Sequence, residues 1–568
     1  MTEGLPIPKS AEIEAAFEAL SAPGMPFEVI TKTVDGVEYQ GIARQPANMA
    51  QLFMLCLQYG EADFLVLGDQ RYSFTDTYSA AAMIAQALVE RYKIKQGDRV
   101  AIAAKNSPEW LIAAIGIMAS GAILVPYNAW WQKSELAYGL KDTQPGVIFA
   151  DASRLRRFDG LPEAEGIAFI GLDMEATVAP AAAVFGDLVE KGVPTAMPEV
   201  DLDSGDDVLI LYTSGSTGYP KGAVSTHGAL VSALMALAAI AAATKLALVG
   251  PDGEMPRQPS ALVAGPFFHV AALHVGCLMS LVIGRRIVMT DKWDADEVLR
   301  LVEAEAITSC GGVPAMTLEV LEAAKTTKYD LSSIMDMTTG GAPFPPGTVA
   351  KVPQIIPGAR TTCIYGLTET NALGTVITRD AYLDRPDSVG KALPPTVEIK
   401  IVDEEGKDLP PGEHGEILIK TIANARGYWR RPEDSAEAFR DGWHLTGDIG
   451  YLDEEGYVFI ADRKKDIIIR GGENISSVEV EGVIHQHPDV AEVAVFGFPD
   501  ERLGEIVAAV IRPKAGLVID QGKLREFVGE KLAYFKVPER LFETSEPLPR
   551  TATLKLDKPQ IRLIYKDK

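Results

Sequence analysis

Cysteine is scarce in this chain. Four cysteines, Cys56, Cys277, Cys310 and Cys363, are spread over 568 residues, and none of them stands in a C-x-x-C pair. This spacing excludes a disulfide framework and offers no zinc-binding motif. Such scarcity is typical of proteins in a reducing compartment. We therefore expect a cytoplasmic protein.

Positive charge is also in short supply. The chain has 54 Lys and Arg against 78 Asp and Glu, a formal net charge of −24 at pH 7. Nucleic acids and anionic membrane surfaces require a net basic face, so we expect neither to be the main partner. Anionic ligands must instead be bound by local clusters of basic residues.

No secretory signal is visible at the start, because residues 1–4 lead to acidic Glu12 and Glu14 instead of a basic segment and an apolar core. One apolar stretch, 228–243, has sixteen residues. A helix needs about 20 to cross a bilayer. We interpret this Ala-rich stretch as a buried core helix and expect no transmembrane segment.

Several common enzyme motifs are missing from the sequence. It contains no G-x-S-x-G elbow, no G-x-G of any kind and no G-x-x-x-x-G-K-[ST] loop. These absences argue against a serine hydrolase, a dinucleotide-binding dehydrogenase and an ordinary P-loop nucleotide switch.

The most informative stretch that is present runs from 211 to 222, LYTSGSTGYPKG, and follows the apolar run 208–211. It predicts a strand that leads directly into a phosphate-binding loop. Four hydroxyl groups can donate to phosphate oxygens: those of Thr213, Ser214, Ser216 and Thr217. Glycine lets backbone N–H groups turn toward the same anion at three positions: Gly215, Gly218 and Gly222. Lys221 adds positive charge. The structural alternative is a polar surface turn.

This loop resembles the signature loop of the adenylate-forming superfamily, which includes acyl-CoA synthetases, luciferases and the adenylation domains of peptide synthetases. The resemblance covers roughly residues 60–568, and further family motifs follow in the family order: TTGGAP at 338–343, CIYGLTET at 363–370, WHLTGD at 443–448, DRKKD at 462–466, RGGEN at 470–474 and PRTATLK at 549–555. The last motif departs from the family pattern, because Leu554 stands where Gly is commonest.

The resemblance implies a role for each motif. The implied ATP-binding residues are Thr213, Ser214, Gly215, Ser216, Thr217, Gly218, Lys221, Gly341, Ala342, Pro343, Tyr365, Gly366, Asp448 and Arg463. Among these, Tyr365 and the Gly-Ala segment stack on adenine, and Asp448 and Arg463 contact the ribose. Lys465 is implied to occupy a hinge, and Gly471 and Gly472 to line the pantetheine tunnel of coenzyme A.

The implied catalytic residues are Lys555, Thr368, Glu369 and His269. Thr368 touches the α-phosphate in the family pattern, Glu369 binds Mg²⁺, and His269 lies at the mouth of the acyl pocket. A structural role is the alternative for two of them. Glu369 resembles a carboxylate favoured at a helix start, and His269 beside aromatic residues resembles an ordinary core histidine.

The predicted fold class is α/β. The pattern predicts helices at 78–92 and 108–119 that alternate with strands at 100–104 and 122–126, as in a mostly parallel sheet. We predict a large N-terminal domain over 1–462, made of layered sheets with helices and a β-rich subdomain near 412–428. A hinge at 463–465 leads to a small α+β C-terminal domain over 466–568, which we expect to rotate between the two half-reactions.

The resemblance implies an ATP-dependent acyl-CoA synthetase that uses Mg²⁺ and coenzyme A. It forms acyl-AMP and pyrophosphate, and then transfers the acyl group to the CoA thiol. A carboxylic acid is already ionised at pH 7, so the first step needs no general base. It needs positioning and cancellation of charge, which Lys555, Lys221 and Mg²⁺ on Glu369 would supply.

The acid is predicted to be a medium- or long-chain fatty acid or a similarly apolar acid. Its pocket should be built from 265–276, 310–316 and 338–344, where glycines leave space and Phe267, Phe268, Val270 and Val313 are apolar. The alternatives are an aryl-acid CoA ligase, an enzyme that loads a carrier protein, a luciferase-like oxygenase and an inactive nucleotide sensor. A homodimer is left open.

Overall fold

The computed structural model describes residues 8–174, 176–178, 180–213, 220–290, 292–341, 344, 346–471, 473–551 and 555–566. The chain divides into two compact units. Unit 1 consists of residues up to 386 together with 390–399 and 419–444, and unit 2 consists of 387–389, 400–418 and everything from 445 onward.

The first sheet of unit 1 is mostly parallel. Within the described residues it has eight strands, in the order β21 (Gly427–Tyr428), β11 (Lys221–Thr226), β10 (Asp207–Thr213), β6 (Ile123–Pro126), β5 (Arg99–Ala103), β7 (Val147–Asp151), β8 (Ala168–Leu172) and β9 (Ala183–Val184). The strands from β10 through β9 pair in parallel, whereas β10 and β11 form an antiparallel hairpin. The loop of that hairpin is the predicted phosphate-binding loop.

The second sheet of unit 1 has nine described strands. Their order is β18 (Lys391–Ala392), β17 (Gly374–Thr378), β16 (Arg360–Gly366), β15 (Asp336–Gly340), β14 (Ser309–Gly312), β12 (Ser260–Leu262), β13 (Arg286–Met289), β3 (Asp63–Leu67) and β4 (Gln70–Ser73). Strands β14, β15 and β16 are parallel neighbours. Their carboxyl ends therefore lie at one edge of the sheet, where ligands of such sheets bind.

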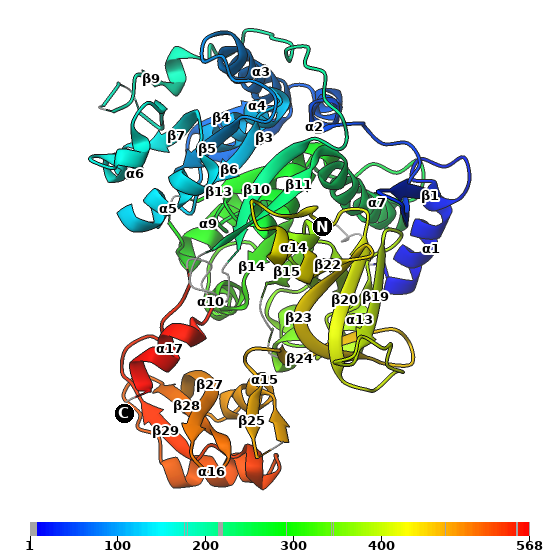
Figure 1. Ribbon diagram of the computed structural model, residues 1–568. Coiled ribbons are helices and arrows are strands. Elements are labelled where there is room, and N and C mark those ends of the chain that lie inside the picture. Colours follow the sequence, from blue (N-terminus) through cyan, green and yellow to red (C-terminus); the bar gives the residue numbers. More distant parts are fainter. Residues whose placement is uncertain are drawn as a thin grey trace. The chain divides into compact units, whose positions relative to one another are not determined.

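Helices α3 (Phe74–Glu90) and α4 (Pro108–Ala119) pack against each other and contact strands of both sheets (Figure 1). Every residue of α4 is buried. The two helices come so close that a Cβ atom on Gly116 would lie 2.6 Å from the carbonyl oxygen of Ala81. This apolar layer packs against both sheets.

Helix α7 (His227–Val249) contains the apolar stretch that the sequence predicted to be a core helix. By length and composition alone it could cross a membrane, but 67% of its most apolar window is buried inside the protein. It contacts α1 (Ser10–Ser21), α2 (Met49–Phe53) and the π-helix η5 (Ala271–Leu278). The core-helix interpretation explains its composition.

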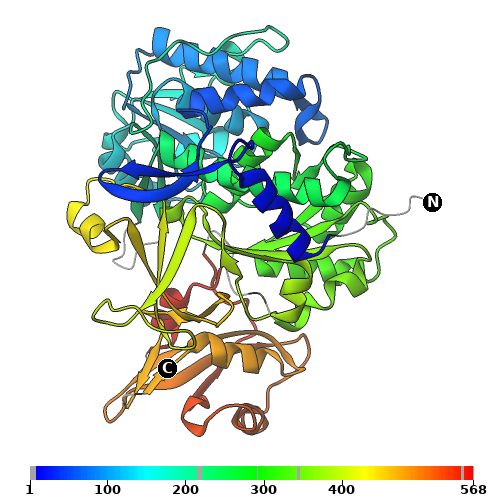
Figure 2. The same cartoon turned by 90° about the vertical axis from the view of Figure 1, so that its right-hand side faces the viewer.

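The N-terminal helix α1 and the β1–β2 hairpin (Val29–Val34 and Val37–Ile42) lie on the surface of unit 1, in blue in Figure 2. The start of α1 is joined to α13 (Arg379–Asp384), because the backbone N–H and the hydroxyl of Ser10 both donate to Asp380 Oδ1 at 2.8 Å. A segment that the sequence left without any role is thus fastened beside the second sheet.

The β-rich segment that the sequence predicted is present. A further sheet has the order β19 (Val397–Val402), β20 (Gly415–Thr421), β23 (Trp443–Leu452) and β22 (Phe439–Arg440), and β24 (Val458–Arg463) pairs with β23. Ile417 and Ile419 of β20 are both fully buried, as their alternation predicts.

The C-terminal part of unit 2 is an α+β arrangement. Its sheet has the order β26 (Glu473–Ile475), β25 (Ile468–Arg470), β28 (Gly504–Pro513) and β27 (Val490–Asp500), and β29 (Arg540–Glu543) pairs with β28. Helices α15 (Ser477–His485), α16 (Gln521–Gly529) and α17 (Lys558–Tyr565) accompany it. A buried ion pair of 2.8 Å between Lys558 and Glu481 links α17 to α15.

Candidate active site

The phosphate-loop prediction falls partly outside the described residues, because Ser214, Gly215, Ser216, Thr217 and Gly218 are not among them. The strands that flank the loop are described. Thr213 lies opposite Lys221 in the β10–β11 register, and its hydroxyl donates to the Lys221 carbonyl at 3.3 Å. The loop therefore begins and ends on two hydrogen-bonded strands.

Lys221 and Glu369 lie on either side of one tyrosine. The Lys221 ammonium is 5.4 Å from the ring centroid of Tyr428, and the Tyr428 hydroxyl donates to Glu369 Oε1 at 2.9 Å. Lys221 also forms an ion pair of 2.6 Å with Asp434 of α14 (Pro432–Ala438). Two residues that the sequence could only assign to separate motifs are thus neighbours in one cluster.

The environment of Glu369 is protected from water. Glu369 is buried in the short 3₁₀ helix η6 (Thr368–Thr370), and its backbone carbonyl accepts from the Ala425 N–H at 2.7 Å. Burial raises the pKa of Tyr428, and the Glu369 carboxylate raises it further. Tyr428 therefore remains a neutral donor to the carboxylate.

The carboxyl ends of β15 and β16 lie side by side, because Gly340 pairs with Ile364 in parallel register. Gly341 directly follows Gly340, and Tyr365 directly follows Ile364, so two of the residues predicted to bind adenine stand near the ends of neighbouring strands. Gly366 is sterically required, since a Cβ atom there would lie 2.2 Å from the carbonyl oxygen of Ala372. Ala342 and Pro343 lie outside the described residues.

A buried polar network holds η6 in place, and no motif in the sequence indicates this network. Asn371 follows η6 directly in the left-handed conformation, with φ of +49°. Its Oδ1 accepts from the Ser225 hydroxyl at 2.7 Å and lies 2.9 Å from His274 Nε2. Its amide donates to the Ala423 carbonyl at 2.8 Å. Asn371 thereby joins β11, the π-helix and the Glu369 turn.

His269 belongs to a row of aromatic side chains. Its ring lies 4.7 Å from that of Phe268, and the Phe268 ring makes an edge contact of 5.3 Å with Trp130. Trp130 is half exposed, whereas its neighbour Trp131 is buried against Tyr212. Trp131 therefore packs in the core, whereas Trp130 remains partly accessible.

In unit 2, Asp448, Arg463 and Lys555 lie close together. Asp448 and Arg463 are paired in the β23–β24 register and joined by an ion pair of 2.7 Å. Lys555 is exposed as a residue, yet protein atoms surround its ammonium. This desolvation lowers the pKa of Lys555, nearby Arg463 lowers it further, and Asp448 raises it. Three residues from three separate motifs thus form one electrostatic cluster.

The predicted hinge segment is a turn after β24. The Asp466 N–H donates to the Arg463 carbonyl at 2.8 Å, and Lys465 between them is exposed. Gly471 has a φ of +59°, which favours glycine, whereas Gly472 lies outside the described residues.

Two family models match the chain: the AMP-binding enzyme model over residues 54–429 and the AMP-binding enzyme C-terminal domain model over 479–555. The chain belongs to the AMP-binding enzyme family. A feruloyl-CoA synthase of an Amycolatopsis species is 34% identical over 471 residues, which are 83% of this chain and 89% of that protein.

Two further relatives of this AMP-binding enzyme cover nearly its whole length. A long-chain-fatty-acid–CoA ligase of Bacillus subtilis is 31% identical over 92% of this chain and 93% of its own. The solved structure of the Bacillus subtilis o-succinylbenzoate CoA synthetase with its acyl-adenylate intermediate has a TM-score of 0.76 and 27% identity, covering 91% and 98% of the two chains.

The enzyme is therefore an AMP-forming acid–thiol ligase, and ATP, Mg²⁺ and coenzyme A are its cofactors. The local structure fits Mg²⁺. Among the described residues no group of three or more His, Cys, Asp or Glu side chains could hold a metal. Mg²⁺ is commonly bound by one or two carboxylates together with substrate phosphates. Glu369 is a buried carboxylate that shares the Tyr428 contact with Lys221.

Sequence reasoning missed Tyr428, Asp434 and Asn371. Tyr428 stands in an unremarkable β-rich stretch, and its importance comes from pairing of β21 with β11. The only signal for Asn371 was its position directly after the 363–370 motif.

Proposed function

We propose that this enzyme joins an apolar carboxylic acid to coenzyme A through an acyl-AMP intermediate. The observation that carries the proposal is the cluster of Lys221, Tyr428 and Glu369, which holds a cation and an anion next to the loop between β10 and β11. Triphosphate binding requires such a cation, and a bound magnesium ion requires such an anion.

In the first step a carboxylate oxygen bonds to the α-phosphorus of ATP while the bond to pyrophosphate breaks. The acid is already ionised, so no proton moves. Lys221, Thr368 and Lys555 are proposed to stabilise the negative charge that gathers at the reacting groups. Mg²⁺, when bound at Glu369, offsets charge on the phosphates. Asp448 and Arg463 are proposed to bind the ribose.

In the second step the CoA sulfur bonds to the acyl carbon, AMP leaves, and the thiol proton passes to solvent. Gly471 and Gly472 are proposed to admit the pantetheine arm, and residues 463–465 to serve as the hinge between the steps. We also propose a cytoplasmic location, which the scarcity of cysteine favours, and a homodimer.

We propose a medium- or long-chain fatty acid as the substrate, with His269 at the mouth of its pocket. The apolar Phe268 and half-exposed Trp130 beside His269 support an apolar acid. The similarity to a long-chain-fatty-acid–CoA ligase supports it further. The same aromatic row favours an aryl acid as the second candidate, because rings stack well on rings.

A screen of acids for ATP-dependent pyrophosphate release tests the substrate class. Octanoate and palmitate are expected to exceed ferulate and benzoate in kcat/KM. The reverse order would establish the aryl-acid alternative, and a preference for acetate or an amino acid would overturn the apolar-acid proposal. Thioester formation, measured against hydroxylamine-trapped adenylate, separates a CoA ligase from an enzyme that only adenylates.

A further inference from the structure

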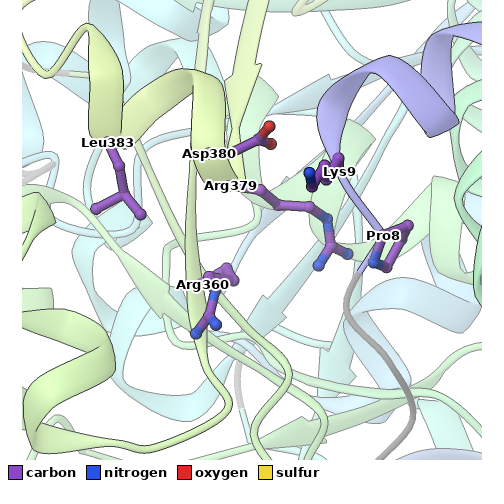
Figure 3. Close-up of a pocket in the computed structure, with 6 residues that line it drawn as sticks. All are labelled: Pro8, Lys9, Arg360, Arg379, Asp380 and Leu383. Carbon is purple, nitrogen blue, oxygen red and sulfur yellow. The ribbon is translucent and has the colours of Figure 1, made fainter.

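A basic pocket lies in unit 1 beside the start of α1. It has a volume of about 250 Å³ and is lined by Pro8, Lys9, Arg360, Arg379, Asp380 and Leu383. Figure 3 shows these side chains, which come from the start of α1, the start of β16 and the helix α13. Three sequence segments that are far apart in the chain thus contribute to one small cavity.

Arg379 is the most unusual residue of the pocket. It is only 7% exposed, and its backbone has a φ of +59°, which is rare for a residue with a side chain. Its Nε is buried without a hydrogen-bond partner among the described residues. A buried guanidinium donor without an acceptor is costly, so most proteins avoid one. The position therefore calls for an acceptor that the described residues do not supply.

The acidic groups nearby are already occupied. Asp380 accepts from both the N–H and the hydroxyl of Ser10. Asp336, which pairs with Arg360 in the β15–β16 register, accepts from the Thr362 hydroxyl at 2.8 Å and from the Thr338 hydroxyl at 3.3 Å. No ion pair within 4.0 Å joins either carboxylate to Arg379 in the described part of the chain, although both carboxylates raise the pKa of Arg379.

The cations of the pocket, by contrast, keep donors to offer. Arg360 uses Nη1 to donate to the Ala359 carbonyl at 2.8 Å, which leaves most of its five N–H groups. Burial lowers the pKa of Arg379, the Asp336 carboxylate raises it, and the Arg360 cation lowers it. Two guanidinium groups therefore repel each other here, and a bound anion would relieve that repulsion.

We propose that this pocket binds a phosphate group. Three cationic side chains and one carboxylate line it, and Asp336 adds a second carboxylate nearby, so the pocket keeps a net positive charge that favours an anion. Guanidinium groups present paired N–H donors that suit phosphate oxygens. The volume equals that of roughly eight water molecules, so it admits one or two phosphate groups with some hydration. This site is independent of the proposed function.

Free phosphate and the pyrophosphate that the enzyme releases are the two sources of such a group. Isothermal titration calorimetry on the full-length enzyme tests both, with saturating AMP present to occupy the nucleotide site. Inorganic phosphate and pyrophosphate are titrated separately into the wild type, Arg360→Gln and Lys9→Gln. The matched control is Arg300→Gln, whose arginine is an exposed helix residue paired with Glu297.

The wild type is expected to bind at one site in the presence of AMP. Arg360→Gln should weaken that binding by about tenfold or more, and exposed Lys9→Gln by a smaller factor, because each removes a charged donor. Arg300→Gln should bind like the wild type. The anion that binds with the higher affinity identifies the source of the phosphate group. The proposal would be overturned if neither anion binds in the presence of AMP. It would also be overturned if the wild type and both pocket variants bind with equal affinity.

Thermal melting checks that each variant is folded. If Arg360→Gln does not fold, Lys9→Gln still decides the question, because Lys9 is exposed and its substitution leaves no buried gap.

Discussion

At the scale of single residues, Lys555 offers the sharpest test of the two-step chemistry. Lys555→Ala removes a cation proposed to stabilise charge only during attack on the α-phosphate. Loss of one such group typically costs about 10² to 10³ in rate. Adenylate formation should fall by that factor, as measured by pyrophosphate release. Thioester formation from synthetic acyl-AMP and coenzyme A should continue at nearly the wild-type rate.

Lys523→Ala is the matched control for this prediction. Lys523 is an exposed lysine of the same unit, on α16, and its removal should leave both half-reactions unchanged. Equal losses in both half-reactions of Lys555→Ala would show that the lysine serves the structure instead of one chemical step.

The lowered pKa of Lys555 leads to a prediction about alkaline pH. The ammonium loses its proton at a lower pH than a free lysine, whose pKa is 10.5, because desolvation disfavours the charged form. The rate of adenylate formation should therefore decline on the alkaline side at a pH below 10.5. In Lys555→Arg the decline should move to higher pH, since arginine stays protonated. A pH–rate profile of each half-reaction measures this, and an unchanged alkaline limb in Lys555→Arg would contradict it.

Residues were predictable from the sequence when a motif fixed them, and not when a fold-level contact did. Thr213, Lys221 and Glu369 stand in motifs that show hydroxyl, cation and carboxylate at set spacings. Tyr428 reaches Glu369 only because β21 pairs with β11, and no local pattern encodes that pairing. Sequence reasoning finds the groups that do chemistry more easily than the groups that hold them.

At the scale of elements, two buried histidines should make the fold sensitive to acid. Burial lowers the pKa of both His227 and His274 to about 4, from 6.5 when unfolded. His227 Nδ1 accepts from the Met49 N–H at 3.1 Å, which requires the neutral ring. As the pH falls, the unfolded chain is protonated before the folded protein. The stabilisation from each neutral histidine is therefore complete above pH 6.5 and is lost as pH falls toward 4. Each histidine accounts for about 3 kcal/mol of the free energy of unfolding.

Thermal unfolding at pH 7, 6 and 5 measures this loss. His274→Gln keeps a donor for Asn371 but cannot titrate, so its stability should depend less on pH than that of the wild type. His414→Gln, at an exposed position, is the control. Equal pH dependence in His274→Gln and the wild type would contradict the prediction.

The helices and strands that were predicted followed from hydrophobic periodicity, and the helix boundaries depended on caps. The predicted helix 108–119 coincides with α4, where Ser107 caps the start and Pro108 takes the first position. The helix predicted at 78–92 begins earlier, at Phe74, because Ser73 and Asp76 form a capping box that hydrophobic periodicity does not register. The π-helix η5 has no such sequence signal, since its composition is that of any apolar helix.

At the scale of the whole molecule, the central prediction is that residues 463–465 act as a hinge. Lys465→Pro fixes φ at one residue of the turn and should restrict the chain to one pose. One half-reaction should then fall strongly while the other stays near the wild-type rate. Lys464→Ala, which removes an ion pair to Glu416 but leaves the backbone free, is the control. Wild-type rates for both half-reactions in Lys465→Pro would refute the hinge.

The pairing of β3 with β13 has a consequence for how the protein is made. The ribosome delivers β3 early, yet its parallel neighbour in the second sheet is β13, which appears only after the whole first sheet except β21. Synthesis at about 5–20 residues per second leaves roughly ten to forty seconds between the appearance of β3 and that of β13. During that time the apolar Phe64, Leu65 and Val66 can be covered by β4, α3 and α4, but not by β13. The nascent chain is therefore most open to misassembly, and most in need of chaperones, before β13 has left the ribosome.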